Sequence, residues 1–206
     1  MEISDTERAS QAIAAYEHSL AEFITAWNRV EASYRALLIA ICGKTPAAYI
    51  LTAGLGSRGL GEALRSYAAD GMTDPHLSAV KHAVEFYNRV LGFRNYYVHG
   101  IQRIAYSAHA RVAVGEVQAV SSKGRFVLHD ELISQAEIEA ARSMTIRLHH
   151  ALLELLQCFD PGAPEPTPPA DRLEEFRVNN PWPDNLSKPR NYLLQNHFRD
   201  PMPPQE

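Results

Sequence analysis

The sequence predicts a mainly α-helical protein: a helical bundle with a small antiparallel β-sheet inserted between the last two helices. Three features lead to this prediction. Two long stretches repeat apolar residues every three or four positions, short segments rich in Val and Ile follow Gly100, and a third helical stretch comes after them. A chain of 206 residues is long enough to bury a core of this kind without a metal or a disulfide.

The first long helix is predicted by an apolar stripe that continues for about eight turns. Gly43 follows the stripe and is a natural end for the helix. The members of the stripe are Ile13, Tyr16, Leu20, Phe23, Trp27, Val30, Tyr34, Leu37 and Ile41.

A second long helix is predicted from Asp74-Pro75 to Gly100. Asp can cap the free amides of a first turn, and Pro fits there because it lacks an N–H. Arg94 occupies a place in the stripe where an apolar residue is expected, so we expect it to face the core. The apolar members are Leu77, Val80, Val84, Tyr87, Leu91 and Val98.

After Gly100 the pattern changes to that of short strands. We expect strands at 101–107, 111–120 and 126–129, with turn chemistry at 121–124. Ser134 and Glu137 then form the capping box of a last long helix. The stripe of that helix is Ile138, Ala141, Thr145, Leu148, Leu152, Leu155 and Phe159.

The composition changes beyond Asp160. Eleven of the thirteen prolines lie in residues 161–206, and a proline-rich segment cannot continue a helix or a central strand. We therefore predict two parts: a helical domain at 1–160 and an extended, proline-rich C-terminal tail at 161–206.

Charge and hydropathy predict a cytoplasmic protein that does not enter a membrane. No apolar run approaches the length of a membrane span, and acidic residues occupy the start of the chain where a secretory signal would be basic. Cys42 and Cys158 fall on apolar patterns, so we interpret them as reduced core thiols. We expect no metal site and no cofactor.

One glycine motif suggests an alternative function. Gly54, Gly56 and Gly59 match the dinucleotide-binding fingerprint, with Asp74 downstream. That mechanism requires a strand–helix–strand unit in a parallel sheet, whereas this segment is followed by two helices. We therefore expect a turn between helices here, and an NAD-dependent enzyme is the third of our hypotheses.

The sharpest chemical signal is the segment Arg94–Gly100, Arg-Asn-Tyr-Tyr-Val-His-Gly. An Arg and a His with four to six residues between them also occur elsewhere in the chain, so the spacing alone means little. The context separates this copy: it ends an amphipathic helix, and it lies in a stretch without Asp or Glu from Phe86 to Gly115. Asn95 and His99 lie four residues apart on one helix face, so Asn95 could hold the imidazole in one tautomer.

A purely structural interpretation of Arg94 and His99 remains open. Cations near a helix C-terminus complement the helix dipole and bond its last carbonyls. Arg94 could also pair with Glu31 or another acid of the first helix. Arg94 and His99 lie about 140° apart around the helix axis, so within one chain they converge only if the Arg curls round or the last turn unwinds. They could equally converge across a dimer interface.

At these residues the chain resembles the HEPN superfamily. The order of elements is the same, with Arg-Asn-x-x-x-His-Gly ending the later helix of a two-helix core, then a β insertion and a closing helix. With the segment 48–58 (Ala-Tyr-Ile-Leu-Thr-Ala-Gly-Leu-Gly-Ser-Arg), it is similar to a group of uncharacterised bacterial HEPN-like proteins. The resemblance covers about residues 12–159 and leaves the tail out.

The resemblance implies a homodimer that brings two motifs together, and a metal-independent endoribonuclease. Carried over, His99 is the general acid or base, Arg94 holds the phosphate and Asn95 assists His99. We also expect Arg89, Arg103 and Tyr97 to contact the RNA substrate.

Two hypotheses follow from the resemblance. The first is a ribonuclease that serves as a toxin or defence effector, with an antitoxin or another partner protein. The second is a non-catalytic interaction protein, because some members are binding modules. A formal net charge of −4 argues against tight, nonspecific RNA binding.

Overall fold

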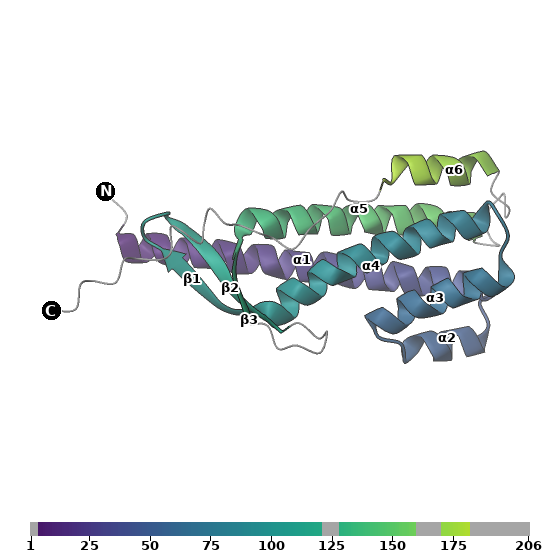
Figure 1. Cartoon of the computed structure of the whole chain (residues 1–206), viewed down its shortest axis with the longest axis horizontal. Helices are drawn as coiled ribbons and strands as arrows, with labels where there is room; N and C mark the ends of the chain where they lie inside the picture. Colours follow the sequence, from purple (N-terminus) through teal and green to yellow (C-terminus); the bar gives the residue numbers. More distant parts are fainter. Residues whose placement is uncertain (1–3, 121–127, 160–169, 182–206) are drawn as a thin grey trace. The chain divides into compact units, whose positions relative to one another are not determined.

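A computed structural model describes residues 4–120, 128–159 and 170–181, and this part of the chain is mainly helical. The prediction of a mainly α protein with a small antiparallel sheet is confirmed. The helices are α1 (Asp5–Ile41), α2 (Pro46–Ala53), α3 (Ser57–Gly71), α4 (His76–Gly100), α5 (Gln135–Phe159) and α6 (Ala170–Asn179) (Figure 1). The strands are β1 (Ile101–Ser107), β2 (Val112–Val120) and β3 (Leu128–Ser134).

The chain divides into two compact units, each with its own hydrophobic core. Among the described residues, the first unit comprises 4–24 and 93–141, and the second comprises Thr25–Gly92 and the residues from Arg142 onward. The helices α1, α4 and α5 contribute residues to both units.

The core of the second unit is built around aromatic residues of α1 and α4. The Tyr34 and Tyr87 rings lie 4.0 Å apart between centroids, and Trp27 packs on Tyr87 at 5.3 Å. Aromatic side chains bury large apolar areas, so these contacts dominate the packing. Other fully buried members are Val30, Leu37, Leu60, Leu64, Phe86, Leu148, Leu152 and Leu155.

The glycine motif forms a turn between two helices, as predicted. Gly54 is the C-cap of α2 and Gly56 is the N-cap of α3. The motif therefore follows a helix, whereas the dinucleotide fold requires a strand at that point. Within the described residues the strands form one antiparallel sheet, so the structure does not support the NAD-dependent alternative.

The sheet is an antiparallel meander of order β1-β2-β3 in the first unit (Figure 1). The first predicted strand matches β1, and the second matches β2 within one residue. The third strand is described from Leu128 and extends to Ser134, beyond its expected end at His129; residues 126–127 of that prediction lie outside the described residues. The predicted turn at 121–124 lies outside the described residues. The sheet lies between α4 and α5 in the chain, and α6 follows, so these are not the last two helices.

The capping box predicted before the last long helix is present at the start of α5. The Glu137 carboxylate accepts hydrogen bonds from the Ser134 amide and hydroxyl, both at 2.7 Å. The Ser134 hydroxyl in turn accepts from the Glu137 amide at 3.3 Å. These bonds satisfy donors that a helix start leaves open. The predicted stripe from Ile138 to Leu155 is buried along its whole length.

The segment 170–179 is a helix, whereas the proline content predicts an extended tail throughout 161–206. Residues 170–180 contain no proline, so the local composition allows α6. Leu173 and Phe176 are buried in the core of the second unit, and the Asn180 side chain donates to the Glu154 carboxylate of α5 at 3.1 Å. The helix therefore belongs to that unit.

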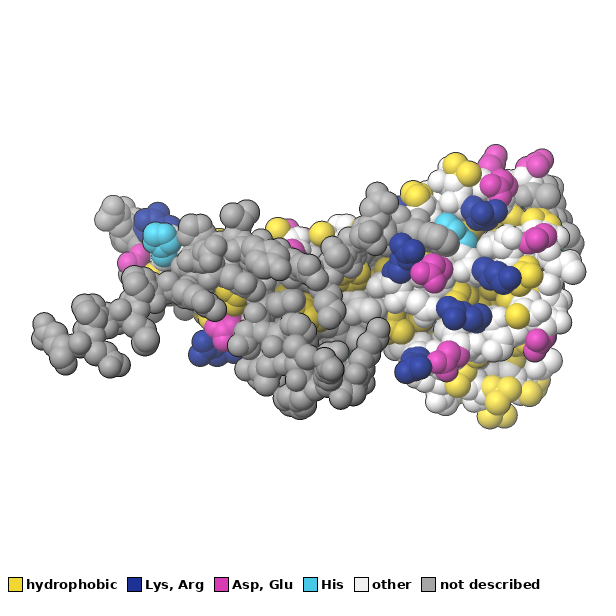
Figure 2. Space-filling view, in the orientation of Figure 1, with side chains coloured by type: hydrophobic (Ala, Val, Ile, Leu, Met, Phe, Trp, Pro, Cys, Tyr) yellow, Lys and Arg dark blue, Asp and Glu magenta, His cyan; other side chains and the backbone are white. Residues whose placement is uncertain are grey.

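The surface of the second unit carries both charge and apolar side chains. Figure 2 shows basic and acidic side chains interspersed over this unit. On α2, the consecutive residues Tyr49, Ile50 and Leu51 are 54%, 75% and 70% exposed. The described helices include none long and apolar enough to cross a bilayer.

We expect Gly115→Ala to destabilise the first unit. A Cβ at this position would overlap the hydroxyl of the buried Tyr16 and lie 3.1 Å from its ring carbon. Overpacking of this kind costs about 1–3 kcal/mol in the free energy of unfolding, measurable by urea denaturation. In a Tyr16→Phe background the loss should be clearly smaller, because the closest contact is gone. Equal losses in both backgrounds would contradict this explanation.

Protonation of His149 should reduce the stability of the second unit. The Ser33 hydroxyl lies 2.9 Å from His149 Nδ1. Burial, followed by the charges of His150 and Arg29, lowers the pKa of His149 below the usual histidine value of about 6.5. Below that pH the unfolded state binds more protons at this group, so the free energy of unfolding falls as the pH is lowered.

The measurement is urea denaturation at a series of pH values between about 7.5 and 5. His149→Gln keeps a hydrogen-bonding side chain but cannot titrate, so its stability should fall less over this range. The exposed His18, exchanged for Gln, is the control and should retain the wild-type pH dependence. A His149→Gln profile parallel to the wild type would refute the assignment.

Candidate functional site

The motif residues Arg94, Asn95 and His99 lie in the last two turns of α4, in the first unit. Arg94 is partly buried, and Asn95 and His99 are exposed. The helix remains regular to Gly100, so the last turn does not unwind. A cation near the end of a helix is stabilised by the helix dipole.

A single nitrogen of Arg94 joins the three side chains. Its Nη1 donates to Asn95 Oδ1 at 3.1 Å and lies 2.7 Å from His99 Nε2. The long Arg side chain therefore curls round the helix, which is one of the ways in which the sequence allows Arg94 and His99 to converge. The structure thus assembles the predicted trio within one chain.

The placement of Arg94 differs from the expectation that it faces the core. The helix α4 carries two adjacent apolar stripes, and the one that leads from Tyr87 and Leu91 to Arg94 does not continue as the buried face. The stripe that stays buried passes through Phe86, Val90, Phe93 and Tyr97. Arg94 lies about 100° from Phe93 around the axis, at the edge of the buried face.

Asn95 acts on a different partner from the one expected. The sequence predicts that it orients His99, whereas its amide oxygen accepts from Arg94. Arg94 then contacts His99 directly. The relation between Asn95 and the imidazole is therefore indirect and passes through the guanidinium.

The acid-free stretch around the motif is bounded by Glu85 and Glu116, and these two residues bond to two of its arginines, Arg89 and Arg103. In the second unit, Glu85 accepts from Arg89 at 3.1 Å. In the first unit, Glu116 takes both Nε and Nη2 of Arg103 at 3.0 and 2.7 Å, which raises the Arg103 pKa. The Glu85–Arg89 ion pair could have been predicted from the sequence, because the two residues lie four positions apart on a helix.

Arg94 stands apart from these two arginines. Within the described part of the chain, neither of its two hydrogen-bond partners is acidic. Glu31, the acid named above as an alternative partner, accepts from Trp27 Nε1 at 3.0 Å and from the Ser57 hydroxyl in the second unit. Among the described residues, therefore, no carboxylate neutralises the positive charge of Arg94, and the charge is available to an anion.

Tyr97 occupies the core of the first unit. It is 3% exposed, and its ring packs edge-on against Phe23 with centroids 5.8 Å apart. Burial, with smaller contributions from Glu137 and Tyr16, raises the pKa of its phenol well above the usual value. Tyr97 therefore packs the buried face of α4 against the core of the first unit, whereas Asn95 and His99 lie on the exposed face of the helix.

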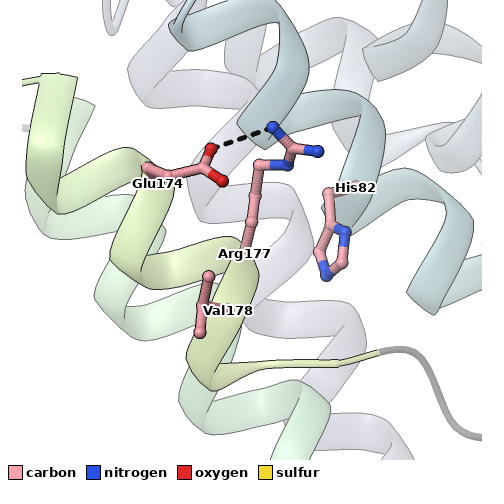
Figure 3. A pocket seen from close by; sticks show the side chains of 4 residues that line it. All are labelled: His82, Glu174, Arg177 and Val178. Atoms are coloured by element: carbon pink, nitrogen blue, oxygen red, sulfur yellow. Dashed lines mark hydrogen bonds and ion pairs between the residues drawn. The ribbon is translucent and has the colours of Figure 1, made fainter.

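A separate pocket of about 290 Å³ lies between α4 and α6 in the second unit. Figure 3 shows His82 from α4 facing Glu174, Arg177 and Val178 from α6. The polar side chains of the pocket have partners: Arg177 donates to Glu174 at 2.9 Å, and His82 Nε2 lies 2.7 Å from the backbone carbonyl of Asn180. These contacts hold α6 in place.

The described residues contain no group of three or more His, Cys, Asp or Glu side chains that could hold a metal ion. Comparison of the chain with protein-family models, with curated proteins and with solved structures gave no match. The contacts of Arg94 with Asn95 and His99 therefore provide the basis for proposing a function.

Tyr97→Ala should destabilise the first unit by about 3–5 kcal/mol, as for other buried aromatic residues. Tyr97→Phe should have a much smaller effect, because the ring contacts with Phe23 remain. The exposed Tyr49, exchanged for Ala, serves as the control and should change the free energy of unfolding by less than about 0.5 kcal/mol. If urea denaturation shows equal stability for Tyr97→Ala and wild type, Tyr97 is not a core residue.

Proposed function

We propose that the chain is a metal-independent endoribonuclease in which Arg94 binds the scissile phosphate and His99 transfers protons. One observation carries the proposal: a guanidinium without an acidic partner among the described residues lies 2.7 Å from an exposed imidazole. A guanidinium can bind the phosphate and an imidazole can take up or release a proton, and RNA cleavage without a metal uses both of these functions.

The reaction uses the 2′-hydroxyl of the RNA as its nucleophile. A base takes the 2′-O–H proton, the oxygen forms a bond to phosphorus, and the bond from phosphorus to the 5′-oxygen breaks. An acid then protonates the departing 5′-oxygen. Arg94 stabilises the additional negative charge on the phosphorane.

A second copy of the chain completes the site. One motif supplies one imidazole, whereas the reaction needs both a base and an acid. A homodimer that brings two copies of His99 to one RNA strand provides both groups. The net charge of −4 keeps nonspecific RNA binding weak, which suits a cytoplasmic toxin or defence effector that acts on selected RNA and is restrained by an antitoxin or another partner protein.

The test is cleavage of mixed cellular RNA by the purified chain in the presence of EDTA. We expect the wild type to cut RNA, and His99→Ala and Arg94→Ala each to lower the rate by about 100-fold or more. Matched controls are His18→Ala and Arg58→Ala, which remove exposed side chains elsewhere on helices. Both controls should cut at the wild-type rate.

Three outcomes would reject the nuclease: intact RNA with the wild type, loss of activity in EDTA, or equal cleavage by the motif variants and the wild type. Sedimentation of the same variants distinguishes the nuclease from the alternative, a non-catalytic interaction protein. If His99→Ala and Arg94→Ala convert a dimer into monomers and the wild type leaves RNA intact, the motif organises an interface in a non-catalytic interaction protein.

A further inference from the structure

The hydrogen bonds of Arg94 divide its guanidinium into an occupied side and an open side. A guanidinium has five N–H donors and no acceptor. The two on Nη1 are directed to Asn95 Oδ1 and His99 Nε2. Within the described part of the chain, the N–H groups on Nε and Nη2 have no hydrogen-bond partner, and they form an edge that can pair with two oxygens of a phosphate.

The same contact determines the tautomer of His99. Because Arg94 can only donate, Nε2 must accept, so its lone pair points at Nη1 and the ring proton is on Nδ1. A lone pair that accepts from Arg94 cannot at the same time accept a proton from a 2′-hydroxyl. In the arrangement observed, His99 is therefore held in a state that does not act as a base.

We propose that Asn95 is a positioning residue for Arg94, and that the Arg94–His99 bond is a resting contact that an RNA phosphodiester replaces. This inference rests on the proposed ribonuclease function. The phosphate first meets the open Nε–Nη2 edge, and its oxygens then compete with Nε2 for the Nη1 donor. Release of Nε2 frees the lone pair that takes the 2′-hydroxyl proton.

The role of Asn95 in this exchange is to retain the guanidinium. Its amide oxygen holds Nη1 at 3.1 Å, so Arg94 can turn from the imidazole to the phosphate without leaving the end of α4. Asn is suited to the task because its oxygen accepts a hydrogen bond but carries no charge. A carboxylate at the same place would neutralise Arg94, as Glu116 does for Arg103.

The test follows the ring nitrogens of His99 in the full chain by long-range ¹H–¹⁵N NMR at about pH 8. We expect the Nδ1–H tautomer in the wild type. A short 2′-O-methylated RNA, which lacks the nucleophile and cannot be cut, should release Nε2 and change this signal.

Two variants of Asn95 distinguish its role in positioning Arg94 from the effect of adding a negative charge beside Arg94. Asn95→Ala removes the acceptor, so the preference for the Nδ1–H tautomer should weaken and the affinity for the RNA should fall by about three- to tenfold. Asn95→Asp keeps an acceptor for Nη1, so it should keep the tautomer, while its charge weakens RNA binding. Asn28→Ala, at an exposed position of α1, is the control and should match the wild type in both measurements.

The outcomes distinguish this inference from the nuclease proposal, because neither measurement requires cleavage. If Asn95→Ala leaves the tautomer as in the wild type, or if bound RNA does not alter the His99 signal, the positioning role is wrong even when the chain cuts RNA. If the tautomer responds to Asn95→Ala and to RNA as expected, the inference stands even when cleavage fails.

Discussion

The burial of Phe93 and Tyr97 determines which way the end of α4 faces in the first unit. Both side chains lie in its core, where Tyr97 packs against Phe23 and Phe93. With about 100° per residue, this packing turns Asn95 and His99 to the opposite side of the helix and leaves Arg94 at the boundary. The chemistry of the motif is therefore a consequence of hydrophobic packing on the other face.

The neighbouring charges make Arg94 different from Arg89 and Arg103. Glu85 and Glu116 lie at the two ends of the acid-free stretch, and Glu85 pairs with Arg89 while Glu116 pairs with Arg103. Exposed ion pairs of this kind contribute little to stability. Their larger effect is on the local charge, because they neutralise two cations, whereas Arg94 has only polar partners among the described residues.

Under the proposed ribonuclease function, Arg94 combines two demands that normally compete. A phosphate-binding cation must be available to its ligand, yet a long side chain in water has many conformations, and fixing one of them on binding costs conformational entropy. The bonds to Asn95 and His99 fix the guanidinium before the ligand arrives and use up one nitrogen only. The imidazole is held by the same bonds, so one anion can act on both groups.

Most of the helical architecture follows from the sequence. The repeat from Tyr16 to Leu37, the capping box at Ser134 and the stripe of α5 could be predicted because each depends on residues close together in the chain. The α6 helix was not predicted, because the high proline content of 161–206 indicates an extended chain and the segment without proline at 170–180 is short. Its burial depends on Leu173 and Phe176 meeting residues distant in sequence.

The sequence by itself determined that Arg94, Asn95 and His99 share the end of a helix in a basic stretch. It could not determine which of two apolar stripes on α4 stays buried, because both have helical spacing and only the contacts with other elements distinguish them. Nor could it determine that Asn95 bonds to Arg94, since that depends on how a long side chain curls round the helix. The tertiary structure decided both, because burial and side-chain direction are settled by packing between distant segments.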